Sequence, residues 1–207
     1  MEQIGTRDPR ADFLAVYHDT IRRDGRSSLL YWLENETDFF TAPASSSKHL
    51  AYPGGLAVHS LNVYKRLRRI AVRDIFKDGP GHLTEEQNET VAILGLLHDV
   101  CKAGVYHQET KRRRNPETKQ WEDYLGYTFR DTFPLGHGEK SLFLITRHMA
   151  LTEEEALAIR WHMGAYDDAV KGGARSMNEA MNLTPWVWRL QEADMCAAWI
   201  DERSAAE

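Results

Sequence analysis

The chain has 207 residues, of which 42% are hydrophobic and 28% charged, a balance typical of a compact globular protein. Its formal net charge of -5 gives no overall attraction to nucleic acid, so contact with a polyanion would require a local basic patch. Because no apolar run approaches the roughly 20 residues of a membrane span, no secretory signal opens the chain and only two cysteines occur, we expect one cytoplasmic domain over residues 1–207.

The first half of the chain predicts helices joined by short polar connections. Apolar residues at helical spacing indicate four of them, over residues 9–23, 28–35, 56–74 and 85–102. Thr84 followed by Gln87 is a capping box that opens the fourth helix. Between the second and third helices the sequence TAPASSSKHLAYPGG contains prolines and glycines that exclude a regular element.

The segment from Gly104 to Gly136 is the least helical part of the chain. It contains the basic run KRRR at residues 111–114 and aromatic residues between Trp121 and Phe133. About 30 residues without structure would be unusual in a compact domain, so a β-hairpin or a long ordered loop is expected. The basic run either contacts an oligonucleotide or is solvated, and the aromatic residues either stack on a base or pack inside the hairpin.

Helices return after this excursion. One is predicted over residues 137–149, and a second runs from a capping box at Thr152 and Glu155 to residue 161. A third, shorter helix begins near Ser176 and is capped with Glu179, and the last covers residues 185–201. Trp186, Trp188 and Trp199 are interpreted as core residues. The fold class is therefore all-α, a helical bundle with one irregular or β-hairpin excursion at about 104–136.

The stretch LLHDVCK places His98 and Asp99 in an otherwise apolar run. Burying two ionisable groups costs several kcal/mol unless they are paired. Other histidines and an aspartate lie beside small or apolar neighbours on or at the end of predicted helices: His59, His137, His162 and Asp194. Four imidazoles and two carboxylates suit a pair of divalent ions such as Fe, Mn, Co or Zn.

Neighbouring residues on a helix point about 100° apart, so His98 and Asp99 can serve one site in different ways. An aspartate can bridge two metals, whereas an imidazole binds one. The expected arrangement has one ion held by His59, His98, Asp99 and Asp194 and a second held by Asp99, His137 and His162. Two ions about 3.5 to 4 Å apart would share a bridging water or hydroxide, which is a strong nucleophile at neutral pH.

The ordered pattern H…HD…H…H…D formed by these residues resembles the HD superfamily of metal-dependent phosphohydrolases, from about Phe39 to Trp199. The segments YPGGLAVHSLNV and LLHDVCK are similar to HD domains related to bacterial 3′–5′ exoribonucleases and to uncharacterised bacterial and phage hydrolases. The resemblance implies a helical fold, a mono- or dinuclear metal site and phosphomonoester or phosphodiester substrates. His137 and His162 are similar to the dinuclear subset, which includes cyclic-nucleotide phosphodiesterases.

The resemblance also suggests that Lys102 contacts a substrate phosphate, where a fixed cation would stabilise charge on the phosphoryl oxygens. Lys140, Arg130 and Arg160 are further candidates for anion contacts. His49 lies in a segment that leads directly into the His59 helix, so it is a candidate for the mouth of the site.

The sequence therefore predicts a metal-dependent phosphodiesterase or phosphomonoesterase that cleaves a nucleotide or short oligonucleotide by attack of metal-bound hydroxide, with Asp99 and Lys102 as its catalytic residues. We expect that the insertion at residues 104–136 can cover the active site. Neither a membrane nor duplex nucleic acid is expected as a partner, and the oligomeric state is left open. Two alternatives also remain open: an HD-type mixed-valent di-iron oxygenase and a non-catalytic nucleotide-sensing module.

Overall fold

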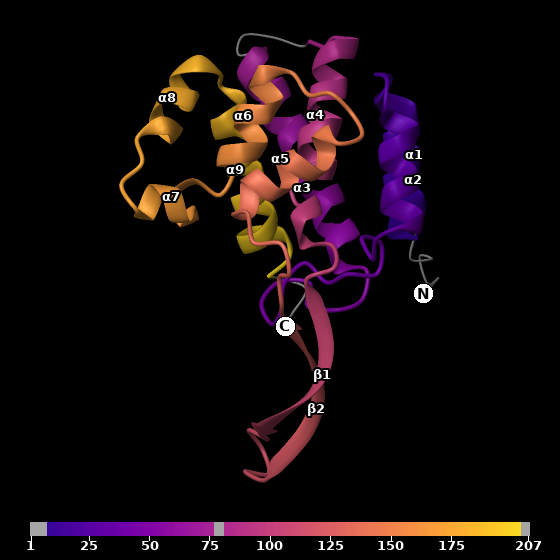
Figure 1. Cartoon of the computed structure of the whole chain (residues 1–207), viewed down its shortest axis with the longest axis vertical. Helices are drawn as coiled ribbons and strands as arrows, with labels where there is room; N and C mark the ends of the chain where they lie inside the picture. The colour runs from indigo at the N-terminus through magenta and orange to yellow at the C-terminus, as the bar shows by residue number, and fades with distance from the viewer. Residues whose placement is uncertain (1–7, 77–80, 204–207) are drawn as a thin grey trace.

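The computed structural model describes residues 8–76 and 81–203, and residues 1–7, 77–80 and 204–207 lie outside this description. The α-helices are α1 (Pro9–Thr20), α2 (Arg26–Asn35), α3 (Gly55–Ile75), α4 (Glu85–Leu97), α5 (His137–Thr146), α6 (Glu153–Trp161), α7 (Asp168–Lys171), α8 (Ser176–Leu183) and α9 (Trp186–Cys196). Shorter helical turns are η1 (Val100–Lys102), η2 (Gly164–Tyr166) and the π-helix η3 (Ala197–Asp201), and the strands are β1 (Tyr106–Arg114) and β2 (Trp121–Phe129). The predicted all-α fold with one β-hairpin excursion is confirmed (Figure 1).

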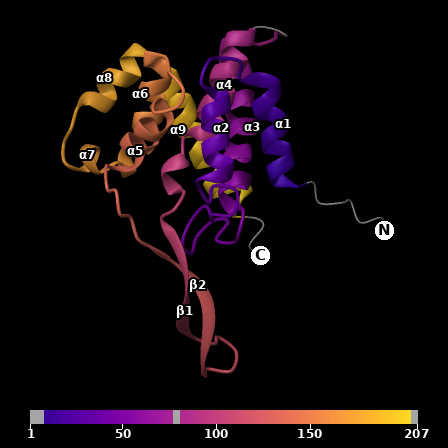
Figure 2. The ribbon, with the colours of Figure 1, turned by 45° about the vertical axis from the view of Figure 1, so that its right-hand side comes forward.

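The bundle is built around α3 and α4. Every residue of α4 from Thr90 to Leu97 is buried, as expected for a helix that is apolar on all sides and lies at the centre of a fold. α3 packs against α1, α4 and α9. Figures 1 and 2 show α1 and α2 on one side of this central pair and α5 to α8 on the other.

Helix starts follow the sequence more closely than helix ends. Both predicted capping boxes are present: Thr84 accepts from the backbone N–H of Gln87, and Thr152 accepts from that of Glu155. The cap predicted for α8 is wrong, because the residue before this helix is Arg175 and its side chain makes no capping hydrogen bond. The predicted connection between the helices over residues 56–74 and 85–102 includes residues 77–80, which lie outside the described residues.

The excursion is a two-stranded antiparallel hairpin that projects away from the helices (Figures 1 and 2). Among the aromatic residues from Trp121 to Phe133, Tyr127 is buried and the others are exposed. Phe129 also contacts Tyr106 across the strands, with ring centres 5.8 Å apart. Two arginines of the basic run on β1 lie over aromatic rings of β2. Arg112 lies 5.7 Å from the ring centre of Trp121, and Arg113 lies 4.9 Å from that of Tyr124. Whether the hairpin covers a substrate stays a prediction.

Trp186 is buried as predicted, but Trp188 and Trp199 are exposed, so the prediction that all three tryptophans belong to the core is wrong for two of them. Within the described ranges, no helix is both long and apolar enough to cross a membrane. The single domain and the cytoplasmic location stay predictions.

A buried carboxylate on α6 ties three segments of the bundle together. Glu155 is fully buried, and its carboxylate accepts hydrogen bonds from Arg23 at 2.6 and 2.9 Å, from Thr90 Oγ1 at 3.0 Å and from the backbone N–H of Thr152 at 2.9 Å. The network connects the α1–α2 connection with α4 and the start of α6, so its loss would leave several polar groups unpaired.

We expect Glu155→Ala to lower the free energy of unfolding by about 3 kcal/mol, because removing one partner of a buried ion pair strands the other. Urea unfolding at neutral pH measures this change. Glu153→Ala is the matched control, since Glu153 is exposed in the same helical turn and its loss should cost less than about 0.5 kcal/mol. Equal effects of the two substitutions would show that the buried network does not contribute as described.

Candidate metal centre

Close packing of α3 on α4 brings His59 beside His98. A Cβ atom added to Gly95 would lie 2.4 Å from Tyr64 Cα, a distance that no side chain tolerates, so only glycine permits this approach. His59 lies near the start of α3 and His98 directly follows α4, and their ring centres are 5.3 Å apart.

A second pair of helices places His137 beside His162 in the same way. A Cβ atom at Gly138 would lie 2.2 Å from the carbonyl oxygen of Arg160, so glycine lets α5 approach the end of α6. His137 opens α5 and His162 follows α6, with ring centres 5.1 Å apart. His162 also lies 5.0 Å from His98, which joins the two helix pairs into one cluster.

The local geometry at Asp99 differs from the sequence prediction. Residues 85–102 were expected to form one helix, but α4 ends at Leu97 and residues 100–102 form a 3₁₀ turn. Asp99 itself has φ -109 and ψ 17, outside the α-helical region. The argument that His98 and Asp99 are neighbours within a helix is therefore wrong, and the tight turn after Leu97 brings Lys102 back to Asp99.

The Asp99 carboxylate lies at the centre of the cluster. Its Oδ1 atom is 2.6 Å from His137 Nε2 and 3.6 Å from His162 Nε2. Its Oδ2 atom is 3.3 Å from His59 Nε2 and 3.5 Å from His98 Nε2. The two oxygens thus face two different pairs of histidines, as a bridging carboxylate would.

Asp194 on α9 closes one side of the cluster. Its Oδ1 atom lies 3.1 Å from His59 Nε2 and 4.0 Å from His98 Nε2. The structure therefore brings together all six residues predicted as metal ligands. Their division between two ions stays a prediction.

The histidine nitrogens fit a metal ion better than any protein partner that the structure provides. His98 Nδ1 donates to the carbonyl oxygen of Gly95 at 3.1 Å, and His162 Nδ1 donates to that of Ile159 at 2.7 Å. In a neutral ring, an Nδ1–H that donates leaves Nε2 as an unprotonated acceptor. The Nε2 atoms of His59, His98 and His162 are buried without a hydrogen-bond partner among the described residues. Burying acceptors against a carboxylate is costly, and a cation between them would offset this cost.

The ionisation of the cluster agrees with this reading. Burial lowers the pKa of His98 to about 3, so its imidazole is neutral at physiological pH. Burial alone would raise the pKa of Asp99, but the charges of Lys102, His98 and His137 hold it well below its usual range. A neutral imidazole and an ionised carboxylate are the forms that bind divalent metals.

His59 is held in place by carboxylates on both sides of its ring. Burial would lower the pKa of His59, but the carboxylates of Asp194, Asp99 and Glu202 around the ring outweigh it and raise this pKa well above the ordinary value. The position of the ring therefore favours a positive charge, which a metal ion can supply in place of a proton.

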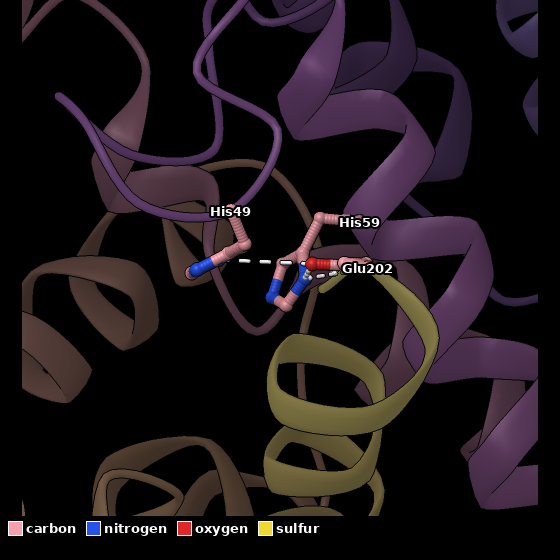
Figure 3. A group of neighbouring side chains, drawn as sticks. All are labelled: His49, His59 and Glu202. Carbon is pink, nitrogen blue, oxygen red and sulfur yellow. Dashed lines mark hydrogen bonds and ion pairs between the residues drawn. The ribbon is translucent and has the colours of Figure 1, made fainter. Parts of the chain in front are cut away.

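Glu202 is the residue of this site that sequence reasoning missed. Its buried carboxylate lies 3.0 Å from His59 Nδ1 (Figure 3). It also accepts from Asn62 Nδ2 at 3.1 Å. Counting seven residues along a regular helix from Asp194 leads to Asp201 on the same face. The π-helix adds one residue, with the Glu202 N–H donating to the Ala197 carbonyl at 3.0 Å, so Glu202 takes that position instead.

Lys102 lies at the edge of the cluster, where its Nζ atom is 2.6 Å from Asp99 Oδ2. Burial would lower the pKa of Lys102, but the charges of Asp99, Tyr106 and Asp194 raise it above the ordinary value. Its side chain is 15% exposed, so a fixed cation lies between the candidate metal ligands and solvent.

The other predicted anion contacts are paired with carboxylates that are not among the predicted ligands. Lys140 Nζ lies 2.6 Å from Asp131 Oδ1, and Arg130 Nη2 lies 3.1 Å from Glu109 Oε2. Arg160 pairs with Asp167 at 2.8 Å and also with Glu139. A role of these cations in substrate binding stays a prediction.

His49 reaches the cluster from the loop before α3. Its ring centre is 5.1 Å from that of His59, and its Nε2 atom is 3.8 Å from Glu202 Oε2 (Figure 3). Burial, together with repulsion from His59 and Lys102, lowers the pKa of His49 to about 4. The expected position beside the site is observed, and its contact with substrate stays a prediction.

Comparison with known families gives one match. The family model described as HD domain matches residues 56–199, more than half of the chain. No curated protein and no solved structure matches the chain.

If the cluster binds divalent metal, adding Mn²⁺, Co²⁺ or Zn²⁺ to chelator-treated protein should raise its melting temperature by about 5 to 10 °C. A ligand at 100 times its Kd contributes about 2.7 kcal/mol, and each kcal/mol shifts Tm by about 2–4 °C for a chain of this size. His98→Ala should abolish most of the shift, whereas His107→Ala on the exposed part of β1 should preserve it. A full shift in His98→Ala would exclude this cluster as the binding site.

Loss of the Glu202 carboxylate should weaken metal binding without removing a ligand. We expect Glu202→Ala to lower metal affinity by about 10- to 100-fold, because it frees the His59 ring, and Glu202→Gln to recover part of this loss by keeping an acceptor for Nδ1–H. Competition with a chromophoric chelator measures the affinity. The control is Glu192→Ala, which removes from α9 the partner of Arg73 on α3. Equal affinities of Glu202→Ala and wild type would contradict the role of Glu202.

Proposed function

Because the chain belongs to the HD domain family, we propose that it is a metal-dependent phosphohydrolase that cleaves a nucleotide or short oligonucleotide. Members of this family are mostly metal-dependent phosphohydrolases, so membership indicates a metal-dependent hydrolase-type function. One observation carries the finer proposal: the buried Nε2 atoms of His59, His98 and His162 converge on the two oxygens of Asp99, and none of the three has a hydrogen-bond partner in the described part of the chain.

The chain's residues have separate tasks in this proposal. Divalent ions, two in number and of the Fe, Mn, Co or Zn type, would activate water and neutralise charge on the phosphoryl group. Asp99 would hold both ions through its two oxygens. The backbone carbonyls of Gly95 and Ile159 fix the orientation of His98 and His162, so the site needs little rearrangement when it binds metal.

Lys102 is suited to contact the phosphoryl oxygens. Its ammonium group has three donors, of which one is directed to Asp99 Oδ2, and its raised pKa keeps it charged. A cation held in this way strengthens its interaction as negative charge grows on the phosphoryl group in the transition state.

The hairpin supports the oligonucleotide part of the proposal. Cross-strand pairs of arginine and aromatic side chains, Arg112 with Trp121 and Arg113 with Tyr124, combine cations and ring faces, which is the chemistry that binds single strands. β1 begins at Tyr106, which is close enough to Lys102 to raise the pKa of that lysine.

We expect Mn²⁺- or Co²⁺-dependent hydrolysis of p-nitrophenyl phosphate or bis(p-nitrophenyl) phosphate, both with and without oxygen. Lys102→Met should lower kcat by about 10²- to 10³-fold with metal content unchanged, because it removes one stabilising contact to the transition state. Asp99→Ala should abolish activity. Lys65→Met, which removes an exposed cation from α3, is the control and should retain wild-type kcat.

Three outcomes would contradict the proposal. Full activity of Asp99→Ala would exclude the site. A requirement for iron together with oxygen consumption, and no anaerobic hydrolysis, would indicate a di-iron oxygenase. Nucleotide binding without turnover under any metal would indicate a sensing module.

A further inference from the structure

A pocket of about 390 Å³ lies beside the candidate metal centre, and nothing described so far uses it. It is lined by Lys48, His49, Ala198, Trp199, Glu202 and Arg203. The loop before α3 therefore forms one wall, and η3 with the two residues after it forms the other. The volume lies within the range of small-molecule sites, about 300–1,000 Å³.

The pocket adjoins the metal centre through two of its residues. Glu202 lines the pocket and also accepts from His59 Nδ1, and the His49 ring lies 5.1 Å from the His59 ring (Figure 3). A molecule in the pocket is thus separated from a candidate metal ligand by one side chain. A ligand in the pocket would have to extend past His49 or Glu202 to reach the metal centre.

The lining has a polar floor and a cationic, aromatic rim. Glu202 is buried, whereas Lys48, Trp199 and Arg203 are exposed. The Arg203 guanidinium lies 5.4 Å from the ring centre of Trp199, so charge and aromatic surface occur together. His49 Nε2 is buried without a hydrogen-bond partner among the described residues, which leaves a group able to bond a ligand.

We propose that this pocket binds the base of a nucleotide whose phosphate lies at the metal centre, an inference that rests on the proposed function. A flat aromatic ligand can stack on Trp199, and the polar edge of a base can bond to His49. The Glu202 carboxylate repels a phosphate from the floor, so the base occupies the pocket and the phosphate lies outside it. Lys48 and Arg203 at the rim offset the ligand's negative charge.

Calorimetric titration of the chelator-treated, full-length protein tests base binding without turnover. The ligands are AMP, GMP, CMP, UMP and ribose 5-phosphate, which has no base. At least one nucleotide should bind more tightly than ribose 5-phosphate. Trp199→Ala should weaken binding of that nucleotide by about 5- to 150-fold, the range expected for one base stacked on an aromatic ring, and should leave binding of ribose 5-phosphate unchanged.

Trp188→Ala is the matched control, because Trp188 is 57% exposed on α9, compared with 48% for Trp199 in η3, and does not line the pocket. It should bind nucleotides as wild type does. The inference would be overturned if every nucleotide bound no more tightly than ribose 5-phosphate. It would also be overturned if Trp199→Ala and Trp188→Ala had equal effects on nucleotide binding.

Hydrolysis separates this inference from the proposed function. In metal-loaded protein, Trp199→Ala should lower kcat/KM for the preferred nucleotide more than for bis(p-nitrophenyl) phosphate. Hydrolysis with equal losses on both substrates would leave the proposed function intact and refute the base pocket. Trp199-dependent nucleotide binding without hydrolysis of any ester would support the pocket and refute the function.

Discussion

The site depends on one electrostatic constraint: hydrogen-bond acceptors are buried facing other acceptors. The Nδ1–H groups of His98 and His162 are already used by backbone carbonyls, so their Nε2 lone pairs face the oxygens of Asp99. In a low-dielectric interior such an arrangement is costly unless a cation lies between the acceptors. The buried cluster is therefore most stable with metal bound, and the surrounding fold must keep it assembled when metal is absent.

Two close helix contacts provide that assembly. Gly95 lets α4 approach Tyr64 on α3, and Gly138 lets α5 approach the end of α6. Each contact delivers one pair of histidines, and Asp99 lies at the junction with one oxygen toward each pair. The geometry of the metal centre is thus a property of helix packing, and a bulkier residue at either glycine would separate its pair of histidines.

The residue types of the centre could be predicted from sequence because histidines and aspartates among apolar neighbours need partners. The hairpin could be predicted because a long polar segment rarely stays without structure. The end of α4 could not be predicted, because the apolar run continues through Val100 and Cys101 and gives no signal for the 3₁₀ turn after Asp99. The exposure of Trp199 was also missed, because helical spacing assumes a regular helix and this residue lies in η3, where the helix widens.

The same widening explains Glu202 and connects the two halves of the site. In a regular helix Asp201 would share the face of Asp194, whereas the added residue leaves Asp201 to pair with Arg66 and turns Glu202 toward His59. Glu202 then both orients a candidate metal ligand and forms the floor of the neighbouring pocket. The π-helical turn η3 determines both the position of Glu202 beside His59 and its position in the pocket. A change that restored a regular helix in η3 would therefore alter the His59 orientation and the pocket shape together.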